Sequence, residues 1–186
     1  MDYNKFIKIA KSDENKIIPI IKSKSDLGKI RFSPKIIEYV LRENYCKEDI
    51  CDIQEVENGY NFVLSVGTIT SKDEISYCLE NNIKIFFSPH LDKKLVNYCF
   101  DNNAIMIPGV FTATEIMDAY NMGIKVVKFF PYNFFYNTNC LKSFLNVFNK
   151  LDLKFIVTGG VNKENYKDIL SLKNVIYVGS SSINDI

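Results

Sequence analysis

The sequence predicts an α/β protein built on a parallel sheet, and two observations support this. From residue 61 onward, apolar runs of strand length alternate with amphipathic stretches of helical length in six successive units. Such an alternation implies parallel strands joined by right-handed crossovers. In addition, Gly, Pro, Ser or Thr follows nearly every apolar run. A doubly wound sheet also fits the alternation, but small residues at the carboxyl ends of strands favour a (β/α) barrel, which builds its active site there.

The elements of the six units follow from their hydrophobic periods. Strands are expected over residues 62–66, 83–88, 104–107, 124–130, 153–157 and 175–178. Helices are expected over 71–81, 92–102, 139–149 and 162–171, with a further helix that starts at Thr112 or Thr114 and runs to 121. Ser71 and Glu74 have the spacing of a capping box, which fixes the start of the first of these helices.

The front of the chain is less regular. Residues 16–21 read as a first strand, although Pro19 is unusual inside a central strand. Residues 22–29 are too short and polar for a complete crossover helix. Pro34 is typical of a first helical turn and predicts a helix over about 34–43. Asn58-Gly59 stands between two alternating runs and predicts an antiparallel hairpin. We therefore expect a barrel that is irregular or shortened in its first two units.

Composition limits the class of protein. A chain of 186 residues with 47% hydrophobic content suits one domain, residues 1–186, with a sizeable core. The net charge of +1 and the mixed charges argue against nucleic-acid binding. The five cysteines are scattered and no Cys/His pair completes a metal set, so we expect reduced thiols and no metal. Without an apolar signal core or an apolar run of about 18 residues, the protein is expected in the cytoplasm and away from membranes.

Lys128 is the strongest candidate for chemistry. It lies near the end of the apolar run 124–130, which should be buried on both faces of a parallel sheet. An unpaired buried ammonium group is costly, so the side chain must reach a cavity, a partner or water. Burial also favours the neutral amine, which is a nucleophile toward carbonyl groups. The alternative is a surface lysine at a strand end.

The last two predicted strands end in two loops of small residues, Thr158-Gly159-Gly160 and Gly179-Ser180-Ser181. In (β/α) barrels, the loops after the seventh and eighth strands commonly bind phosphate through backbone N–H groups and helix N-termini. Glycine lets an anion approach the backbone closely. The two loops therefore predict a phosphate site.

From about residue 61 to 182 the chain resembles the 2-keto-3-deoxy-6-phosphogluconate aldolase family, also called 4-hydroxy-2-oxoglutarate aldolases. The motifs that carry the resemblance are Ile17-Ile18-Pro19-Ile20-Ile21, Val66-Gly67-Thr68, Phe87-Ser88-Pro89, Ile107-Pro108-Gly109-Val110, Thr114-Glu115-Ile116-Met117, Lys128-Phe129-Phe130-Pro131, Thr158-Gly159-Gly160-Val161 and Val178-Gly179-Ser180-Ser181. The resemblance implies a class I aldolase on a (β/α)₈ barrel of the TIM type. Such an enzyme is a homotrimer without a cofactor and cleaves a 2-keto-3-deoxy-6-phospho sugar acid or 4-hydroxy-2-oxoglutarate to pyruvate plus glyceraldehyde 3-phosphate or glyoxylate.

The resemblance also implies roles for individual residues. Lys128 would form the Schiff base, and Thr68 would lie near the carboxylate of the pyruvyl group. Pro89 and Phe130 would line the pocket. The substrate phosphate would be held by Thr158, Gly159, Gly160 and Ser181.

The front of the chain departs from the family. The second strand of the family carries a Glu that shuttles protons and, four residues later, an Arg that binds the substrate carboxylate. A local alignment places Arg31 on the arginine and Leu27 on the glutamate, so the expected carboxylate is not found there. Asp26, Glu55 or Glu57 could supply a carboxylate in space, but no motif supports any of them.

Two other functions compete with an active aldolase. The first is a catalytically impaired barrel that binds a phosphorylated or keto-acid ligand or a partner protein, as the missing glutamate suggests. The second is a phosphate-binding isomerase or epimerase, which the absence of paired acid/base residues disfavours. His90 could enter a site from its strand end, and the aromatic residues between 129 and 136 could cap the site or pack against a neighbouring subunit.

Overall fold

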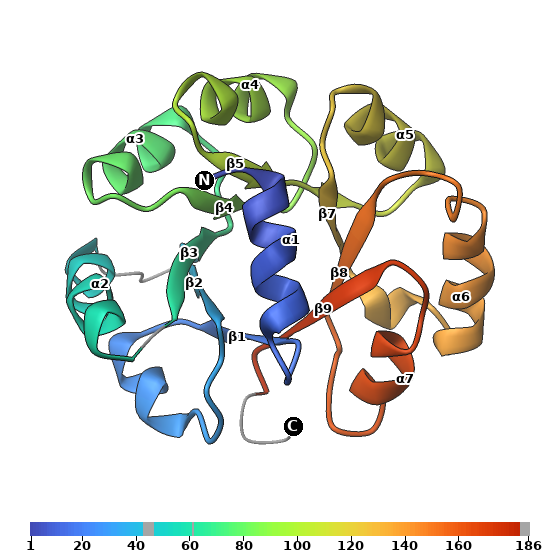
Figure 1. Cartoon of the computed structure of the whole chain (residues 1–186), viewed down its shortest axis with the longest axis horizontal. Coiled ribbons are helices and arrows are strands. Elements are labelled where there is room, and N and C mark those ends of the chain that lie inside the picture. Colours follow the sequence, from blue (N-terminus) through green and yellow to red (C-terminus); the bar gives the residue numbers. More distant parts are fainter. Residues whose placement is uncertain (43–46, 61, 183–186) are drawn as a thin grey trace.

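A parallel β-barrel surrounded by helices forms the body of the molecule (Figure 1). This computed structural model describes residues 1–42, 47–60 and 62–182, with the backbone alone for 56–60. The strands follow the order β5-β4-β3-β2-β1-β9-β8-β7-β6. Their bounds are β1 Ile17–Ile21, β2 Ile36–Val40, β3 Val63–Gly67, β4 Ile85–Phe87, β5 Ile105–Ile107, β6 Gly109–Val110, β7 Val126–Phe129, β8 Lys154–Thr158 and β9 Val175–Ser180. The predicted barrel of the TIM type is confirmed.

The barrel closes where the chain passes from β5 to β6. These two strands stand at opposite ends of the sheet order, yet only Pro108 separates them in sequence. The carbonyl of Pro108 accepts a hydrogen bond from the Lys128 N–H of β7 at 2.9 Å, and the Gly109 N–H donates to Ser88 O, beyond β4, at 2.9 Å. One short segment is therefore bonded to both edges of the sheet, which leaves the barrel nearly closed.

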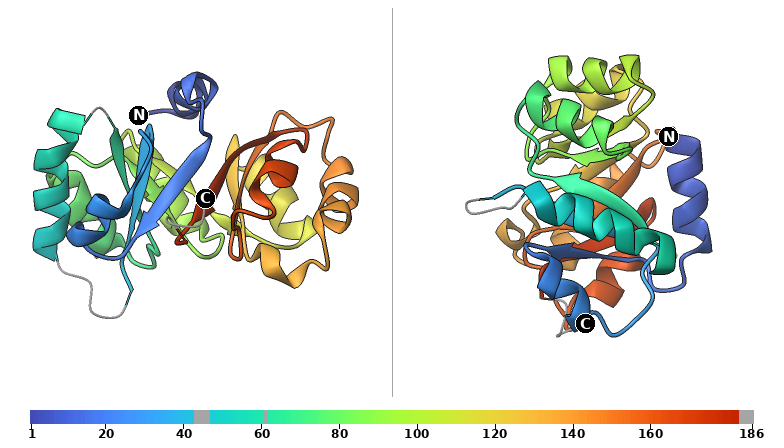
Figure 2. Two further views of the ribbon diagram at one scale, coloured as in Figure 1. Left: turned by 90° about the horizontal axis from the view of Figure 1, so that it is seen from below. Right: turned by 90° about the vertical axis from the view of Figure 1, so that its left-hand side faces the viewer.

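Helices cover the outside of the barrel (Figures 1 and 2). They are α2 Lys47–Tyr60, α3 Lys72–Glu80, α4 Lys93–Asp101, α5 Ala113–Asn121, α6 Thr138–Asn146 and α7 Tyr166–Leu170, with short 3₁₀ helices η1 Lys24–Lys29 and η2 Tyr132–Phe134. Helix α1, Tyr3–Ser12, lies at one end of the barrel instead. The capping box of Ser71 and Glu74 forms as predicted. In the described part of the chain, no helix has the length and apolarity needed to cross a membrane.

Helix α1, which the sequence analysis did not predict, lies across the amino-terminal end of the barrel (Figure 1). Phe6 is fully buried and its ring lies 6.1 Å from that of Tyr177 on β9. The Tyr177 hydroxyl donates to Asp13 Oδ2 at 2.9 Å. Burial, together with the nearby carboxylate, raises the pKa of Tyr177 well above its usual range. This end of the barrel is therefore plugged by side chains, and the opposite end remains for a site.

Two predictions for the front of the chain are wrong. Residues 36–40 form strand β2 instead of part of a helix, because all five side chains are buried between β1 and β3 and pair in parallel with both. The predicted hairpin at Asn58-Gly59 is absent, since this dipeptide lies near the end of helix α2. Ile50 and Ile53, three residues apart, are both fully buried and hold this helix on the barrel. Only the first unit is shortened, with η1 in place of a crossover helix.

Candidate active site

A cavity of about 210 Å³ opens at the carboxyl ends of the strands. It is lined by Ile20, Arg42, Lys128, Phe130 and the two loops 158–161 and 179–182. Six residues predicted for the site from sequence meet here: Lys128, Phe130, Thr158, Gly159, Gly160 and Ser181. They come from three neighbouring strands, β7, β8 and β9, whose parallel order brings their carboxyl ends to one edge.

Lys128 is buried and paired. Its side chain projects from β7, and its Nζ donates a hydrogen bond to Glu38 Oε1 at 3.0 Å. Both side chains are almost fully buried, at 8% and 1% exposure. The rings of Phe87 and Phe130 lie with their centroids 5.5 and 5.6 Å from Nζ, within the range of cation–π contacts. A buried pair of opposite charges is a candidate functional group, since burial of charge is costly unless geometry compensates it.

Glu38 corrects the expectation that no carboxylate of the second strand would be found beside the lysine. It lies in the middle of β2, in register with Ile20 of β1 and Ser65 of β3. A side chain at Gly67 of β3 would collide with it: an added Cβ would overlap Oε1 and lie 2.8 Å from Glu38 Cγ and Cδ. The carboxylate can therefore reach Lys128 because residue 67 has no side chain.

The second arginine of the chain lies at the cavity, and the first does not. Arg42 follows Glu38 by four residues and lines the cavity of Lys128. Arg31 is exposed, donates from Nη1 to Gly28 O at 2.9 Å and lines a different groove. Arg31, which the sequence predicts as the residue that binds the substrate carboxylate, therefore lies outside the lining of the Lys128 cavity.

The other acidic candidates have different positions. Asp26 accepts hydrogen bonds from the backbone N–H groups of Lys22 and Ser23 and pairs with Lys29 at the surface. Glu55 lies on the outer helix α2, and the side chain of Glu57 lies outside the described residues. The sequence itself contained the signal that was missed, a Glu and an Arg four residues apart at positions 38 and 42. The helix predicted over 34–43 concealed it.

The two small-residue loops are held together at the cavity. Gly159 and Gly160 have φ of 85° and 91°, a conformation that favours glycine. The Ser180 hydroxyl donates to the carbonyl of Val161 at 2.8 Å and ties the β9 loop to the β8 loop. The hydroxyl oxygen of Thr158 is buried and has no hydrogen-bond partner among the residues that the structure describes. Buried polar atoms are normally satisfied, so this hydroxyl is available to a ligand.

Thr68, Pro89 and His90 stand at strand ends but outside the lining of this cavity. Thr68 directly follows β3 with φ of 64° and is half-buried. Pro89 and His90 follow β4 and are exposed. The carbonyl of His90 accepts a hydrogen bond from the Ser88 hydroxyl at 2.6 Å, which shapes the turn after β4. His90 is therefore not among the residues that line the cavity of Lys128.

Fold and site together define a class of protein: a (β/α)₈ barrel with a buried lysine–glutamate pair and a cavity at the carboxyl ends of its strands. The sequence model of the KDPG and KHG aldolase family matches residues 5–186. The chain therefore belongs to this family. It is 30% identical over 148 residues to the 2-dehydro-3-deoxy-phosphogluconate aldolase of Dickeya dadantii, covering 79% of this chain and 67% of the relative. The KHG/KDPG aldolase of Escherichia coli is 28% identical over the same coverage. The protein is thus an aldolase, a carbon–carbon lyase.

Solved structures agree with the fold. The 2-keto-3-deoxy-6-phosphogluconate aldolase of Zymomonas mobilis with 3-phosphoglycerate superposes with a TM-score of 0.80 at 24% identity, covering 94% of this chain and 84% of that one. The KDPG aldolase of Legionella pneumophila, with pyruvate captured as a covalent carbinolamine intermediate, gives a TM-score of 0.76 at 25% identity, covering 94% and 85%.

Proposed function

We propose that the protein is a class I aldolase that cleaves a 2-keto acid through a Schiff base on Lys128. The single observation that supports this most is the buried contact of 3.0 Å between Lys128 Nζ and Glu38 Oε1. An amine needs a nearby base before it can act as a nucleophile, and a carboxylate at hydrogen-bond distance is such a base.

The first half of the proposed reaction forms the iminium. The ammonium of Lys128 passes a proton to Glu38, and the neutral amine adds to the C2 carbonyl of the keto acid. Glu38 then returns this proton to the hydroxyl of the carbinolamine, which leaves as water. The resulting iminium is an electron sink next to C3.

The second half breaks the carbon–carbon bond. Glu38 takes the proton of the C4 hydroxyl, whose oxygen forms the carbonyl of the aldehyde as the C3–C4 bond breaks. The electron pair of that bond forms the C2=C3 double bond, and the π pair of the iminium moves to nitrogen to give an enamine. The aldehyde leaves, and the carboxyl of Glu38 returns a proton to C3. Water then hydrolyses the imine and releases pyruvate. Proton transfer by one positioned carboxylate is worth about 10²–10⁴-fold in rate.

Two groups would orient the substrate from its opposite ends. Arg42 lines the same cavity and would bind the carboxylate next to the keto group. The planar guanidinium suits this group because it can form two parallel N–H···O bonds with a carboxylate. The anionic group at the other end of the substrate would be held by Thr158, Gly159, Gly160 and Ser181. A phosphate there favours a 2-keto-3-deoxy-6-phospho sugar acid as substrate, with 4-hydroxy-2-oxoglutarate as the second choice. We expect such an enzyme to act in the cytoplasm.

Trapping with borohydride tests the Schiff base. The protein is incubated with pyruvate and borohydride, and the adduct is located by mass spectrometry. We expect it on Lys128, and Lys128→Met should abolish it while circular dichroism shows an intact fold. Absence of the adduct at every pH would contradict the proposal.

Glu38→Gln separates imine formation from cleavage. The amide cannot accept the proton, so we expect cleavage of the substrate to slow by about 10²–10⁴-fold, while trapped adduct still forms, if more slowly. A wild-type protein that forms the adduct but cleaves neither keto acid would instead favour the catalytically impaired barrel. The original reason for that alternative, a missing glutamate, no longer holds because Glu38 stands beside the lysine.

An exposed aromatic surface supports assembly into a homotrimer. Phe134 and Tyr136, in the segment after β7, are 76% and 94% exposed. The Phe134 ring lies 6.1 Å from that of Phe111, which is itself partly exposed. Large exposed apolar groups gathered in one place mark interaction surfaces. Sedimentation should give a trimer for the wild type and a smaller species for the Phe134→Ser/Tyr136→Ser variant; a trimer that survives both substitutions would place the contact elsewhere.

A further inference from the structure

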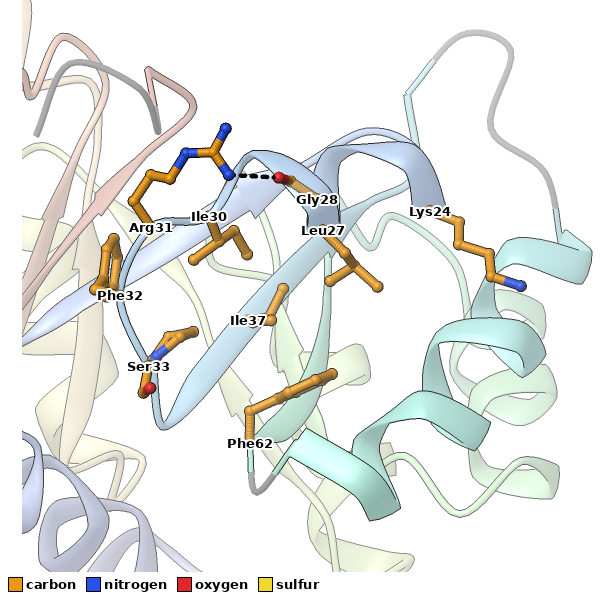
Figure 3. Close-up of a pocket in the computed structure, with 10 residues that line it drawn as sticks. Lys24, Leu27, Gly28, Ile30, Arg31, Phe32, Ser33, Ile37 and Phe62 are labelled. Atoms are coloured by element: carbon orange, nitrogen blue, oxygen red, sulfur yellow. Dashed lines mark hydrogen bonds between the residues drawn. The ribbon is translucent and has the colours of Figure 1, made fainter.

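A large hollow on the described surface lies outside the barrel, where the first crossover helix is replaced by η1. This β1–β2 groove has a volume of about 710 Å³, within the range of about 300–1,000 Å³ that is usual for small-molecule sites. It is lined by Lys24, Leu27, Gly28 and residues 30–34, together with Ile37 and Phe62. Figure 3 shows the side chains of Leu27, Ile30, Ile37 and Phe62 directed into this common space.

The floor and walls of the groove are apolar. Ile37 and Phe62 are buried and form the floor, whereas Leu27 and Ile30 are only half-buried and remain open to a ligand. Ile37 can lie here because neighbouring side chains of a strand point to opposite faces, and Glu38 points into the barrel. Phe32, half-buried, adds an aromatic wall.

The charge at the groove is positive and only partly neutralised. Lys24 contributes its stem to the wall, and its ammonium turns away to pair with Asp52 of α2 at 2.9 Å. The guanidinium of Arg31 stands at the edge of the groove (Figure 3), and its hydrogen bond goes to the carbonyl of Gly28. Among the described residues, Arg31 pairs with no carboxylate, and the lining of the groove contains no Asp or Glu. A cation at the edge of an apolar groove complements an anion with an apolar body.

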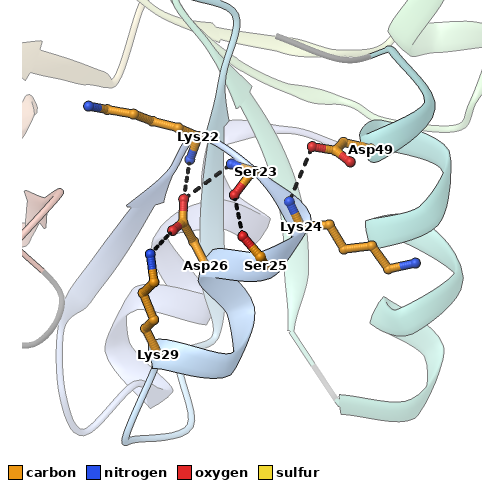
Figure 4. Close-up of polar contacts among 7 residues, drawn as sticks. All are labelled: Lys22, Ser23, Lys24, Ser25, Asp26, Lys29 and Asp49. Atoms are coloured by element: carbon orange, nitrogen blue, oxygen red, sulfur yellow. Dashed lines mark hydrogen bonds and ion pairs between the residues drawn. The ribbon is translucent and has the colours of Figure 1, made fainter. Parts of the chain in front are cut away.

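The wall of the groove is held in place before any ligand arrives. Figure 4 shows Asp26 bonded to the backbone N–H groups of Lys22 and Ser23 and paired with Lys29. The Lys29 Nζ lies 2.6 Å from Asp26 Oδ1. Lys24 N–H donates to Asp49 of α2 at 3.2 Å, which fixes η1 against that helix. A preformed site binds without the cost of ordering a loop.

We propose that the β1–β2 groove binds a small amphiphilic carboxylate, with its apolar chain on Leu27, Ile30, Ile37 and Phe62 and its carboxylate paired with Arg31. This site is separate from the cavity of Lys128 and does not depend on the proposed aldolase reaction. The planar guanidinium suits a carboxylate, because two parallel N–H···O bonds can form.

Methyl NMR on the full chain tests the location. Protein with labelled Ile and Leu methyl groups is titrated with sodium decanoate and, separately, with decanol, which has the same chain and no charge. We expect saturable shifts at Leu27, Ile30 and Ile37 with both probes, and an affinity for decanoate higher by about fivefold, because an exposed ion pair contributes up to about 1 kcal/mol. Shifts centred on Ile20, in the Lys128 cavity, or no saturation with either probe would overturn the proposal.

The two arginines of the chain provide a matched pair of variants. Arg31→Met should abolish the difference in affinity between decanoate and decanol. Arg42→Met should leave that difference unchanged. The opposite result would mean that the carboxylate binds in the barrel and would also overturn the proposal. Ile30→Trp should fill the groove and weaken both probes. Melting curves confirm that each variant is folded, and the wild-type titration decides the location even where a variant is not.

Discussion

At the scale of the residue, Gly67 decides whether the buried pair of Lys128 and Glu38 can form. An alanine methyl there would overlap Glu38 Oε1, and it would have to be accommodated by moving the carboxylate away from Lys128. We infer that Gly67 is a positioning residue that acts through Glu38. Its backbone is in strand β3, so glycine is required here for space and not for an unusual φ.

Gly67→Ala should therefore mimic a partial loss of Glu38. We expect cleavage to slow by up to about 100-fold, because a displacement of about 1 Å in a catalytic group can cost that much. The borohydride adduct on Lys128 should persist, and the pH profile of kcat should change. Gly28→Ala is the matched control, since nothing lies within 4 Å of an added Cβ at that position. Equal activity in the two variants would argue against the positioning role.

At the scale of the element, η1 replaces a complete crossover helix and depends on one carboxylate. Asp26 is partly buried, which by itself raises its pKa, but the ion pair with Lys29 and the N–H groups of Lys22 and Ser23 outweigh this, so the pKa lies below its ordinary value of 3.8. A carboxyl whose pKa is lower in the folded state stabilises that state above its unfolded pKa and loses this effect as the pH falls through the folded value.

Asp26→Asn should then lower the melting temperature at neutral pH. The asparagine side chain carries no charge for Lys29 and accepts more weakly from the two backbone N–H groups. We expect the difference from the wild type to shrink as the pH drops from 6 toward and below 3.8. Thermal melts followed by circular dichroism at several pH values provide the measurement. A difference that does not vary with pH would mean that Asp26 acts by packing alone.

At the scale of the whole molecule, the barrel is closed at one end by α1 and left open at the other. Asp13, just after α1, is buried and links three parts of the chain: it accepts from the Tyr177 hydroxyl of β9, from the N–H of Lys35 before β2, and from the N–H groups of Asn15 and Lys16 before β1. These bonds join the first and last strands where they meet. Helix α1 and Asp13 therefore cover this end of the barrel and fasten the ends of β1, β2 and β9 to one another.

Tyr177→Phe removes one of these bonds and leaves the ring in place. We expect a loss of about 1–3 kcal/mol in the free energy of unfolding, the range for a buried hydrogen bond to a charged group. Tyr136→Phe is the matched control, because Tyr136 is 94% exposed in the single chain and the substitution keeps the ring proposed for the trimer contact. Denaturant titration of both variants gives the comparison, and equal stability would mean that Asp13 is satisfied by backbone N–H groups alone.

The sequence by itself determined the parallel α/β alternation from residue 61 onward, the lysine of β7 and the two small-residue loops. These features depend on local patterns: apolar runs bounded by glycine and proline, and a lysine inside one such run. The first third was predicted less well. Pro34 is typical of a helix start, and Asn58-Gly59 is typical of a hairpin, so the local signals there pointed to the wrong elements.

Only the tertiary structure decided the partner of Lys128 and the place of the two arginines. Residues 36–40 became a strand because β1 and β3 offer hydrogen bonds and burial on both sides, and no local preference of Pro34 outweighs that gain. Once β2 is a strand, Glu38 faces the barrel interior, Gly67 of the next strand leaves room for it, and Lys128, 90 residues away, comes within 3.0 Å. The closed barrel brings these residues together, because strands distant in the chain share one interior.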